Sequence, residues 1–345
     1  MRLLAIDGNS ILNRAFYGIK QLSSSKGVPT NAVFGFMNIY MKNFNNIKPD
    51  CVVAAFDLSA PTFRHKAVSS YKANRKGMPP ELFQQLSLIK ELLALLGIKV
   101  IECEGYEADD ILGTLAKSCF ESENQCFILT GDRDSLQLIN ENTTVLLATN
   151  KETIYYDIQR FTDDYGFEPA KLIDLKALMG DSSDNIKGVA GIGEKTASAL
   201  IKQFGTIENL YENYTSSDLT KSIKTKLENG ENSAKESKWL ATIVCDAPID
   251  RNIESYKLGE IDSKGVSRLL TELEMYKLLE KLNISVSDTS DNIQPEKYEP
   301  VKVTESELTE DIINNFKNTS YLFDGKALKI RDGNIFYTTD SDELI

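Results

Sequence analysis

Short apolar runs recur along the first half of the chain, and an acidic residue or a threonine follows each of them. They occupy residues 3–6, 51–56, 98–103, 126–129 and 144–148. Continuous apolar runs of this length are typical of parallel strands that are buried on both faces. Between them lie longer segments with apolar residues at three- and four-residue spacing, such as 82–97 and 108–119, which predict amphipathic helices. The alternation predicts an α/β fold around a mostly parallel sheet.

A helical region is expected to follow. After about residue 157 the strand pattern fades, and helical spacing with turn residues continues to about residue 282. We therefore expect an α/β unit at 1–175 and a helical lobe at 176–283, which includes the turn-rich stretch 180–197.

The last part of the chain has a different pattern. Residues 284–302 are polar, contain proline and lack periodicity, so we interpret them as a linker. Residues 303–345 contain three strand-like pieces and one helix-like segment near 305–316. This segment is too short to close a core by itself, so we expect the incomplete start of another domain.

Acidic residues follow the ends of the predicted strands. They are Asp7 and Asp57 after the first two strands, Glu107, Asp109 and Asp110 at the helix after the third, and Asp132 and Asp134 after the fourth. Because the carboxyl ends of parallel strands meet at one edge of an open sheet, we expect these seven carboxylates to face one point. Any one of them has a second interpretation as a helix cap, but their recurrence at successive strand ends favours a shared site.

The chemistry of this set points to divalent cations. Crowded carboxylates destabilise a fold unless cations screen them, and oxygen ligands without histidine favour Mg²⁺ or Mn²⁺ over zinc. The only histidine, His65, is interpreted as a solvated loop residue, and the sequence contains no nucleophile elbow and no P-loop. Two Mg²⁺ ions, with Mn²⁺ as an alternative, form the usual clamp for phosphodiester hydrolysis: one ion readies a water and the other steadies the leaving oxygen.

The total charge argues at first against a nucleic-acid ligand. The net charge is −12, whereas phosphate binding normally needs an excess of Lys and Arg. Residues 60–100, however, carry seven Lys or Arg against two Glu. This stretch includes Arg64, Lys72, Arg75 and Tyr71, which predicts phosphate binding with some base stacking, the alternative being a solvated loop.

A glycine-rich turn predicts a second phosphate contact. Gly188, Gly191 and Gly193 precede a helix that begins near residue 194, followed by Lys195 and Thr196. Bare backbone N–H groups at such a helix start suit a phosphate and carry no base information, although a plain turn between helices has the same glycines.

Cysteine spacing and the amino-terminal segment bear on the cellular compartment. The five cysteines form no C-x-x-C pair, and the first apolar run, at 3–6, is too short for a signal-peptide core or a membrane span. We expect a cytoplasmic, nucleoid-associated monomer without membrane contact.

Five ordered motifs extend this interpretation: LLAIDGNSILNRAFYG, VVAAFDLSAPTFRHKAVSSYKANR, GYEADDILGTLA, LTGDRDSLQL and MGDSSDNIKGVAGIGEKTA. In order and spacing they resemble the 5′-nuclease domain of bacterial DNA polymerase I, within the flap-endonuclease superfamily, over about residues 1–283. The resemblance implies a Rossmann-like sheet of the PIN/FEN type, a helical arch at about 60–82 and a helix-three-turn-helix lobe.

The resemblance also implies an activity and residue roles. The activity is a 5′-3′ exonuclease and 5′-flap endonuclease for replication and repair, with partners that are DNA with a 5′ flap, nick or 5′ end and RNA–DNA primer junctions. Asp181 and Asp184 join the metal carboxylates, and K⁺ is expected among the carbonyls of the glycine hairpin. Arg64, Lys72 and Arg75 are placed beside the scissile phosphate, and Arg14, Tyr71, Gly188, Gly191, Gly193, Lys195 and Thr196 along the DNA.

Two alternatives stay open, a catalytically inactive flap- or nick-binding module and a PIN-type ribonuclease. The tail resembles the start of a 3′-5′ exonuclease-like domain. In place of that domain's D-x-E motif, however, it has Asp324, Gly325 and Lys326, so proofreading is expected to be lost. No polymerase activity is expected of this chain.

Overall fold

The computed structural model describes residues 1–284, 319–323, 327–332 and 335–340. The chain divides into two compact units, one from Met1 to Thr289 and another from Ser290 to Ile345.

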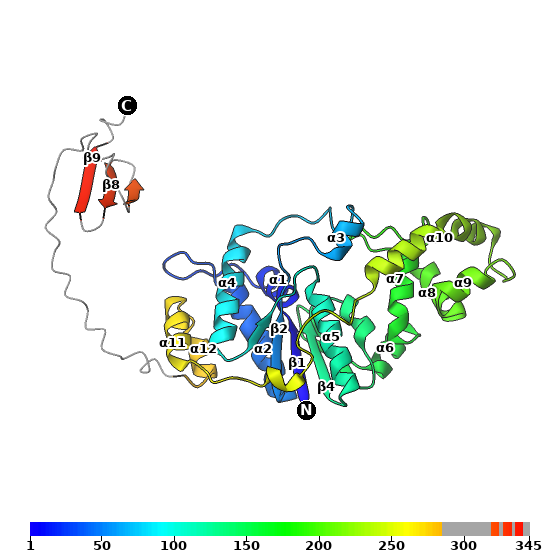
Figure 1. Ribbon diagram of the computed structural model, residues 1–345, viewed down its shortest axis with the longest axis horizontal. Helices are drawn as coiled ribbons and strands as arrows, with labels where there is room; N and C mark the ends of the chain where they lie inside the picture. Colours follow the sequence, from blue (N-terminus) through cyan, green and yellow to red (C-terminus); the bar gives the residue numbers. More distant parts are fainter. Residues whose placement is uncertain (285–318, 324–326, 333–334, 341–345) are drawn as a thin grey trace. The chain divides into compact units, whose positions relative to one another are not determined.

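The first unit is built on a six-stranded sheet (Figure 1). Its strands are β1 (Arg2–Asp7), β2 (Cys51–Ala55), β3 (Lys99–Ile101), β4 (Gln125–Thr130), β5 (Thr143–Ala148) and β6 (Thr153–Tyr156), in the order β3-β2-β1-β4-β5-β6. The first five are parallel, which confirms the predicted strands. The antiparallel β6 was not predicted, although Thr153, Ile154 and two tyrosines are residues that favour strands.

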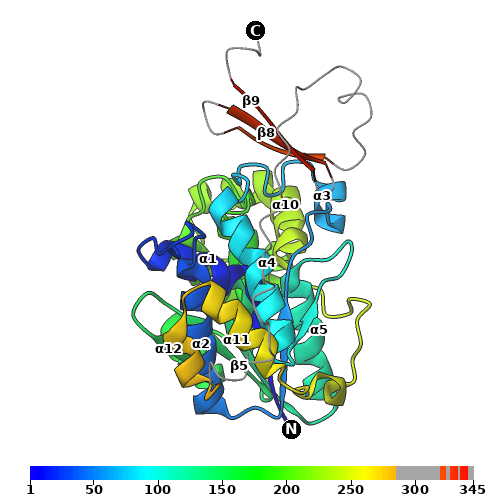
Figure 2. The ribbon, with the colours of Figure 1, turned by 90° about the vertical axis from the view of Figure 1, so that its left-hand side faces the viewer.

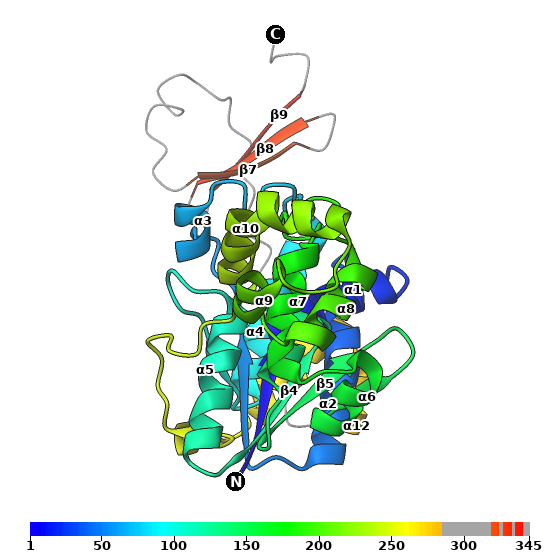
Figure 3. The ribbon, with the colours of Figure 1, turned by 90° about the vertical axis from the view of Figure 1, so that its right-hand side faces the viewer.

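Two helical layers cover this sheet, because alternate residues of each strand point to opposite faces. Leu4 and Ile6 of β1 lie in the core beneath α1 (Gly8–Gly18), α2 (Asn31–Ile47) and α4 (Pro80–Leu95), the side that faces the viewer in Figure 2. Leu3 and Ala5 lie in the other core, against α5 (Ala108–Glu121), which Figure 3 shows. The Rossmann-like α/β fold is thus confirmed.

The strand order places a topological switch at β1. From β1 the chain builds outward to β2 and β3 on one side, then returns to place β4 and β5 on the other. Crossovers therefore leave in opposite directions beside β1, and the crevice beyond its carboxyl end is where open α/β sheets bind ligands.

The segment between β2 and α4 rises above this edge of the sheet (Figure 1). It contains the short helix α3 (Phe63–Ala67), and corresponds to the predicted arch. His65 is not a loop residue but part of α3, where its Nδ1 lies 2.7 Å from the Thr62 hydroxyl in a capping box.

The helical lobe follows β6. It contains α6 (Ile158–Tyr165), α7 (Leu172–Met179), α8 (Glu194–Phe204), α9 (Ile207–Asn213) and α10 (Lys221–Ala241), with the one-turn helix η2 (Pro169–Lys171) between α6 and α7. Two further one-turn helices lie outside this group: η1 (Asp134–Leu138) between β4 and β5, and η3 (Ile253–Tyr256) after α10. The chain then returns to the α/β layers, since α11 (Ser263–Glu272) and α12 (Tyr276–Lys281) bury apolar faces in the core beneath α2 and α4. Sequence periodicity assigned these two helices to the lobe because it carries no information on which core an apolar stripe joins.

In the second unit the described residues form three antiparallel strands, β7 (Thr319–Phe323), β8 (Ala327–Asp332) and β9 (Ile335–Asp340). Residues 285–302 of the predicted linker, the predicted helix near 305–316 and the triplet 324–326 lie outside the described residues. No helix within the described part of the chain is long and apolar enough to cross a membrane.

Candidate active site

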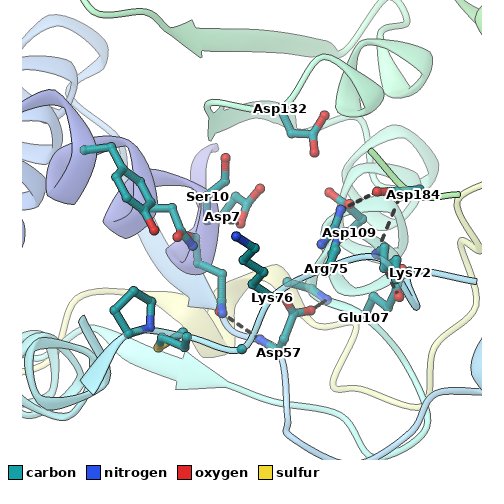
Figure 4. Close-up of a pocket in the computed structure, with 17 residues that line it drawn as sticks. Asp7, Ser10, Asp57, Lys72, Arg75, Lys76, Glu107, Asp109, Asp132 and Asp184 are labelled. Atoms are coloured by element: carbon teal, nitrogen blue, oxygen red, sulfur yellow. Dashed lines mark hydrogen bonds and ion pairs between the residues drawn. The ribbon is translucent and has the colours of Figure 1, made fainter. Parts of the chain in front are cut away.

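A cavity of about 510 Å³ lies beyond the carboxyl ends of β1 and β2 (Figure 4). Six carboxylates and three cations contribute to its lining: Asp7, Asp57, Glu107, Asp109, Asp132 and Asp184, with Lys72, Arg75 and Lys76. Five of the seven strand-end carboxylates therefore share one space, whereas all seven were expected there, and Asp184 from the segment after α7 joins them.

Local backbone geometry positions the two aspartates that end the first strands. Asp7 caps α1 by accepting a 3.0 Å hydrogen bond from the Ser10 N–H, and its other oxygen accepts one of 2.7 Å from the Thr130 hydroxyl. Asp57 accepts a 2.7 Å hydrogen bond from the Ala108 N–H at the start of α5. For Asp7 both interpretations of a strand-end carboxylate hold, since one side chain caps a helix and lines the cavity.

The first turn of α5 separates its acidic residues. Glu107 is the N-cap, and Asp110 accepts a 3.1 Å hydrogen bond from the Glu107 N–H to complete a capping box. Successive residues of a helix point about 100° apart, so Asp109 and Asp110 leave the axis in different directions. Asp109 lines the cavity, whereas Asp110 is fully buried and lies outside its lining.

Asp110 does not face the cavity with the other strand-end carboxylates, because it pairs with Arg64. The Arg64 guanidinium donates two 2.8 Å hydrogen bonds to the Asp110 carboxylate. Its remaining donors reach the carbonyls of Leu240 and Thr242 and, at 3.4 Å, Glu107. Arg64 is 2% exposed and all its N–H groups are engaged, so the prediction of a cation facing phosphate needs correction: Arg64 supports the wall of the cavity.

Tyr71 also differs from its predicted place. Its side chain is buried beside Val68 and Ile186, and its hydroxyl donates a 3.1 Å hydrogen bond to Glu107. A ring buried in this way has no free face for a base, so Tyr71 positions Glu107 instead of stacking on DNA.

Lys72 and Arg75 lie on the rim of the cavity, and their place beside a scissile phosphate stays a prediction. The Lys72 ammonium is 2.9 Å from Glu107 and 3.8 Å from Asp184, and Arg75 forms an ion pair with Asp184. Lys72 has φ of +54°, and its N–H donates to the Asp184 carbonyl, which anchors the arch to the segment after α7. Lys76 completes the rim. It belongs to the basic stretch at 60–100, but no sequence motif singled it out as a site residue.

Two more of the predicted metal carboxylates, Asp134 and Asp181, lie in a neighbouring cavity of about 480 Å³, which Asp132 also lines. There Asp134 and Asp181 both pair with Lys176 of α7, and the Asp181 contact is 2.7 Å. Asp134 faces this cavity because it begins η1, which carries it past the strand end. No sequence motif singled out Lys176.

Burial dominates the electrostatics of the site. It raises the pKa of Asp7 to about 7, with repulsion from Asp57 and Asp132 adding to it. Burial also raises the pKa of Asp134 to about 7 and that of Asp109 well above its usual value. The pKa of Asp181 shifts in the opposite direction. Burial alone would raise this pKa, but hydrogen bonds from Lys176 and Ser183 lower it to about 2.

These donors fit hard divalent cations. The lining offers carboxylate oxygens, and burial penalises their charged forms, a cost that a bound cation removes. Across the described residues, no three His, Cys, Asp or Glu side chains already converge into a metal-binding set. The carboxylates surround the cavity and would have to close on an ion.

The predicted DNA contacts of the glycine turn divide into two groups. Gly188 is buried, with φ of +62°, and its N–H donates a 3.0 Å hydrogen bond to the Ser237 hydroxyl, so it stabilises the fold. Gly191, Gly193 and Lys195 are exposed, and Gly193 is the N-cap of α8.

Thr196 and Arg14 complete the predicted DNA contacts. Thr196 is half-buried in the first turn of α8. Arg14, also half-buried, donates hydrogen bonds of 3.0 Å to the Asn150 side chain and 3.3 Å to the Gly131 carbonyl. Arg14 therefore ties α1 to the ends of β4 and β5.

Solved structures share this architecture. The bacteriophage T5 D15 protein, crystallised with metal ions, superposes with a TM-score of 0.57 at 18% identity and covers 83% of this chain and 100% of its own. The catalytic core of Rad2 in complex with DNA substrate superposes with a TM-score of 0.53 at 16% identity. The match covers 79% of this chain and 86% of the Rad2 chain. This chain thus shares the fold of these two proteins.

Sequence relatives define the family. Residues 2–166 match the 5′-3′ exonuclease N-terminal resolvase-like domain, and residues 167–264 match the 5′-3′ exonuclease C-terminal SAM fold. The chain belongs to the 5′-3′ exonuclease family. DNA polymerase I of Caldicellulosiruptor bescii is 40% identical over 289 residues, which are 83% of this chain and 34% of that protein. DNA polymerase I of Bacillus subtilis is 40% identical over 315 residues, which are 90% of this chain and 35% of that protein. The chain therefore spans about a third of the length of these relatives.

Proposed function

We propose that this chain is a divalent-metal-dependent 5′-3′ exonuclease and 5′-flap endonuclease that hydrolyses DNA and RNA-primer phosphodiester bonds. The observation that carries the proposal is the cavity at the strand switch, where six carboxylates face a rim of Lys72, Arg75 and Lys76. Carboxylates alone repel a phosphodiester, and cations alone supply no metal site. Their juxtaposition fits hydrolysis of an anionic substrate between them.

The proposed role of each carboxylate depends on the cavity that it lines. Asp7, Asp57, Glu107, Asp109, Asp132 and Asp184 would hold Mg²⁺ or Mn²⁺ in the main cavity, and Asp134 and Asp181 in its neighbour. Bound ions would supply a nucleophilic water at neutral pH and neutralise charge on the phosphate oxygens. Asp110, held by Arg64, would fix the start of α5 and so the direction of Asp109.

Lys72 and Arg75 would stabilise the negative charge that develops on the phosphate. Both already lie against carboxylates on the rim, so a phosphate that displaces these contacts meets cations held in place by the fold. This exchange of partners would take place when the substrate binds, so the two cations would already be in position when charge develops, and donors positioned in advance need no further reorganisation during reaction.

The exposed part of the glycine turn would hold the DNA backbone. Gly193 precedes the first turn of α8, whose N–H groups suit a phosphate, and an added Cβ there meets nothing within 4 Å. The carbonyl of Gly191 already accepts a 2.9 Å hydrogen bond from the Lys226 ammonium, so this turn favours cations, and we propose K⁺ there. The substrates would be duplexes with a 5′ flap, nick or 5′ end and primer junctions, bound by a monomer acting at the nucleoid.

A labelled flap duplex tests the function. The purified chain is incubated with the 5′-labelled duplex in Mg²⁺ or in EDTA, and the products are sized. Mg²⁺-dependent release of the flap near its junction is the expected result. Tight binding without cleavage would favour the inactive-module alternative, and cleavage of single-stranded RNA with no flap cleavage would favour the PIN-type ribonuclease.

A further inference from the structure

We propose that Lys176 is a tethered cation that occupies the Asp134 and Asp181 half of the carboxylate site, and that a second divalent ion binds only by displacing it. The inference rests on the proposed metal-dependent function. Lys176 bridges the two carboxylates, with its ammonium 2.7 Å from Asp181 and in direct contact with Asp134. It thus lies where an ion shared by those two side chains would lie.

The two halves of the site differ in their charge balance. Within the described residues Asp7, Asp57, Asp109 and Asp132 form no ion pair; their hydrogen-bond donors are neutral backbone N–H groups and hydroxyls. Asp134 and Asp181, by contrast, share a protein ammonium. Glu107 and Asp184, on the rim of the first half, pair with Lys72 and Arg75, but an ion that binds among the other four carboxylates displaces no ion-paired protein cation. An ion entering the second half must first break a partly buried ion pair.

Burial makes this competition substantial. Lys176 of α7 is 6% exposed and lines the cavity of about 480 Å³. A charge pair shielded from water interacts more strongly than a surface pair, which is worth little. The ammonium is therefore a real competitor for the two carboxylates.

The cavity also has space, beside another carboxylate, for the displaced Lys176 side chain. Lys176 lines the cavity of about 480 Å³ together with Glu194, at the start of α8, as well as the two aspartates. An ammonium released from Asp134 and Asp181 has room in this space beside a carboxylate on the helix that follows the glycine turn. The metal-free protein would then bind one ion readily, among the carboxylates of the first half. A second ion and the Lys176 ammonium would compete for Asp134 and Asp181.

Counting Mn²⁺ ions on the full chain without DNA tests the inference. Free Mn²⁺ is followed by its paramagnetic resonance signal for the wild type, for Lys176→Met, and for the control Lys171→Met, which removes a half-exposed lysine from the neighbouring turn. We expect the wild type to bind one ion tightly and a second at least about tenfold more weakly, and Lys176→Met to tighten the second by about tenfold. Identical isotherms for wild type and Lys176→Met would overturn the inference. Absence of Mn²⁺ binding in every variant would instead contradict the proposed metal-dependent function.

A measurement on the wild type covers the case in which Lys176→Met fails to fold. An amine-reactive acylating reagent is applied with and without saturating Mn²⁺, and the labelling of each lysine is quantified by mass spectrometry. Lys176 should be protected without the ion and become several-fold more reactive with it, while Lys171 stays constant. Lys176 labelling that does not change with Mn²⁺ would refute the displacement.

Discussion

Arg64 of α3 and Asp110 of α5 form a buried, bidentate ion pair, with two hydrogen bonds of 2.8 Å, that joins the arch to the first turn of the helix carrying Asp109. The same guanidinium holds the carbonyls of Leu240 and Thr242 at the end of α10. Three segments distant in sequence therefore meet at one side chain.

Breaking this pair should destabilise the protein. Arg64→Met leaves the fully buried Asp110 carboxylate without its cation, and removal of one partner of a buried pair costs about 3–5 kcal/mol. Urea unfolding measures the change. The control Lys66→Met alters an exposed lysine of the same helix and should shift stability by less than about 0.5 kcal/mol. A comparable small shift for Arg64→Met would contradict the supporting role.

Asp109→Ala should abolish cleavage while flap binding is largely retained. Asp109 lines the carboxylate cavity, whereas the proposed grip on duplex DNA lies in the glycine turn. The single-turnover rate should fall at least about a hundredfold, because changes to groups that merely support metal ligands already cost about 10–100-fold. Asp163→Ala, which removes an exposed carboxylate of α6, should cleave like the wild type. Unchanged cleavage by Asp109→Ala would rule out the assigned site.

Lys72→Ala should lower the cleavage rate more than the affinity for DNA. Its ammonium lies 2.9 Å from Glu107 on the cavity rim, next to where the phosphate would bind. Loss of one fixed donor to developing charge typically costs about 10²–10³ in rate. Single-turnover cleavage and equilibrium binding of the same flap duplex separate the two effects. An equal loss in both would mean that Lys72 acts through binding alone.

Two glycines of one turn should respond differently to alanine. At Gly188 an added Cβ would lie 2.3 Å from the Gly180 backbone nitrogen and φ is +62°, so Gly188→Ala should disrupt folding. At Gly193 an added Cβ meets no atom within 4 Å, so Gly193→Ala should change stability by less than about 1 kcal/mol. Its methyl group would obstruct a phosphate, and affinity for DNA should fall about tenfold, as loss of a charge-assisted hydrogen bond predicts. Thermal unfolding and DNA titration of both variants check these outcomes; full affinity of Gly193→Ala would place the grip elsewhere.

Without divalent ions, stability should decrease as the pH rises from about 4 to about 7. The folded-state pKa values of Asp7 and Asp134 are raised to about 7, so between those pH values the folded protein binds more protons than the unfolded chain. The lowered pKa of Asp181, about 2, has the opposite effect, but its stabilising contribution is constant above about pH 4 and changes only below it. Melting temperatures in EDTA at about pH 5 and about pH 8 measure the slope, and saturating Mg²⁺ should flatten it. The same slope with and without Mg²⁺ would show that the ions bind elsewhere.

Local sequence patterns determined most of the scaffold. Residues 51–56 are all apolar because β2 is buried on both faces, so the strand could be recognised from its own letters. Asp7 and Asp57 were placed at one sheet edge by the geometry of parallel strands, which requires no knowledge of side-chain contacts. The five ordered motifs carried the family assignment.

Tertiary structure alone decided which of these residues face the site. Asp109 and Asp110 are adjacent in sequence, and helix geometry separates their directions, but only the packing of α5 against Arg64 decides which of the two faces the cavity. Lys176 has no motif, yet α7 brings its ammonium onto two carboxylates. Patterns of neighbouring residues encode strands, helices and caps, because those depend on local geometry. The partner of a buried charge lies far along the chain, at Arg64 for Asp110, and is chosen only when the layers pack and water is excluded.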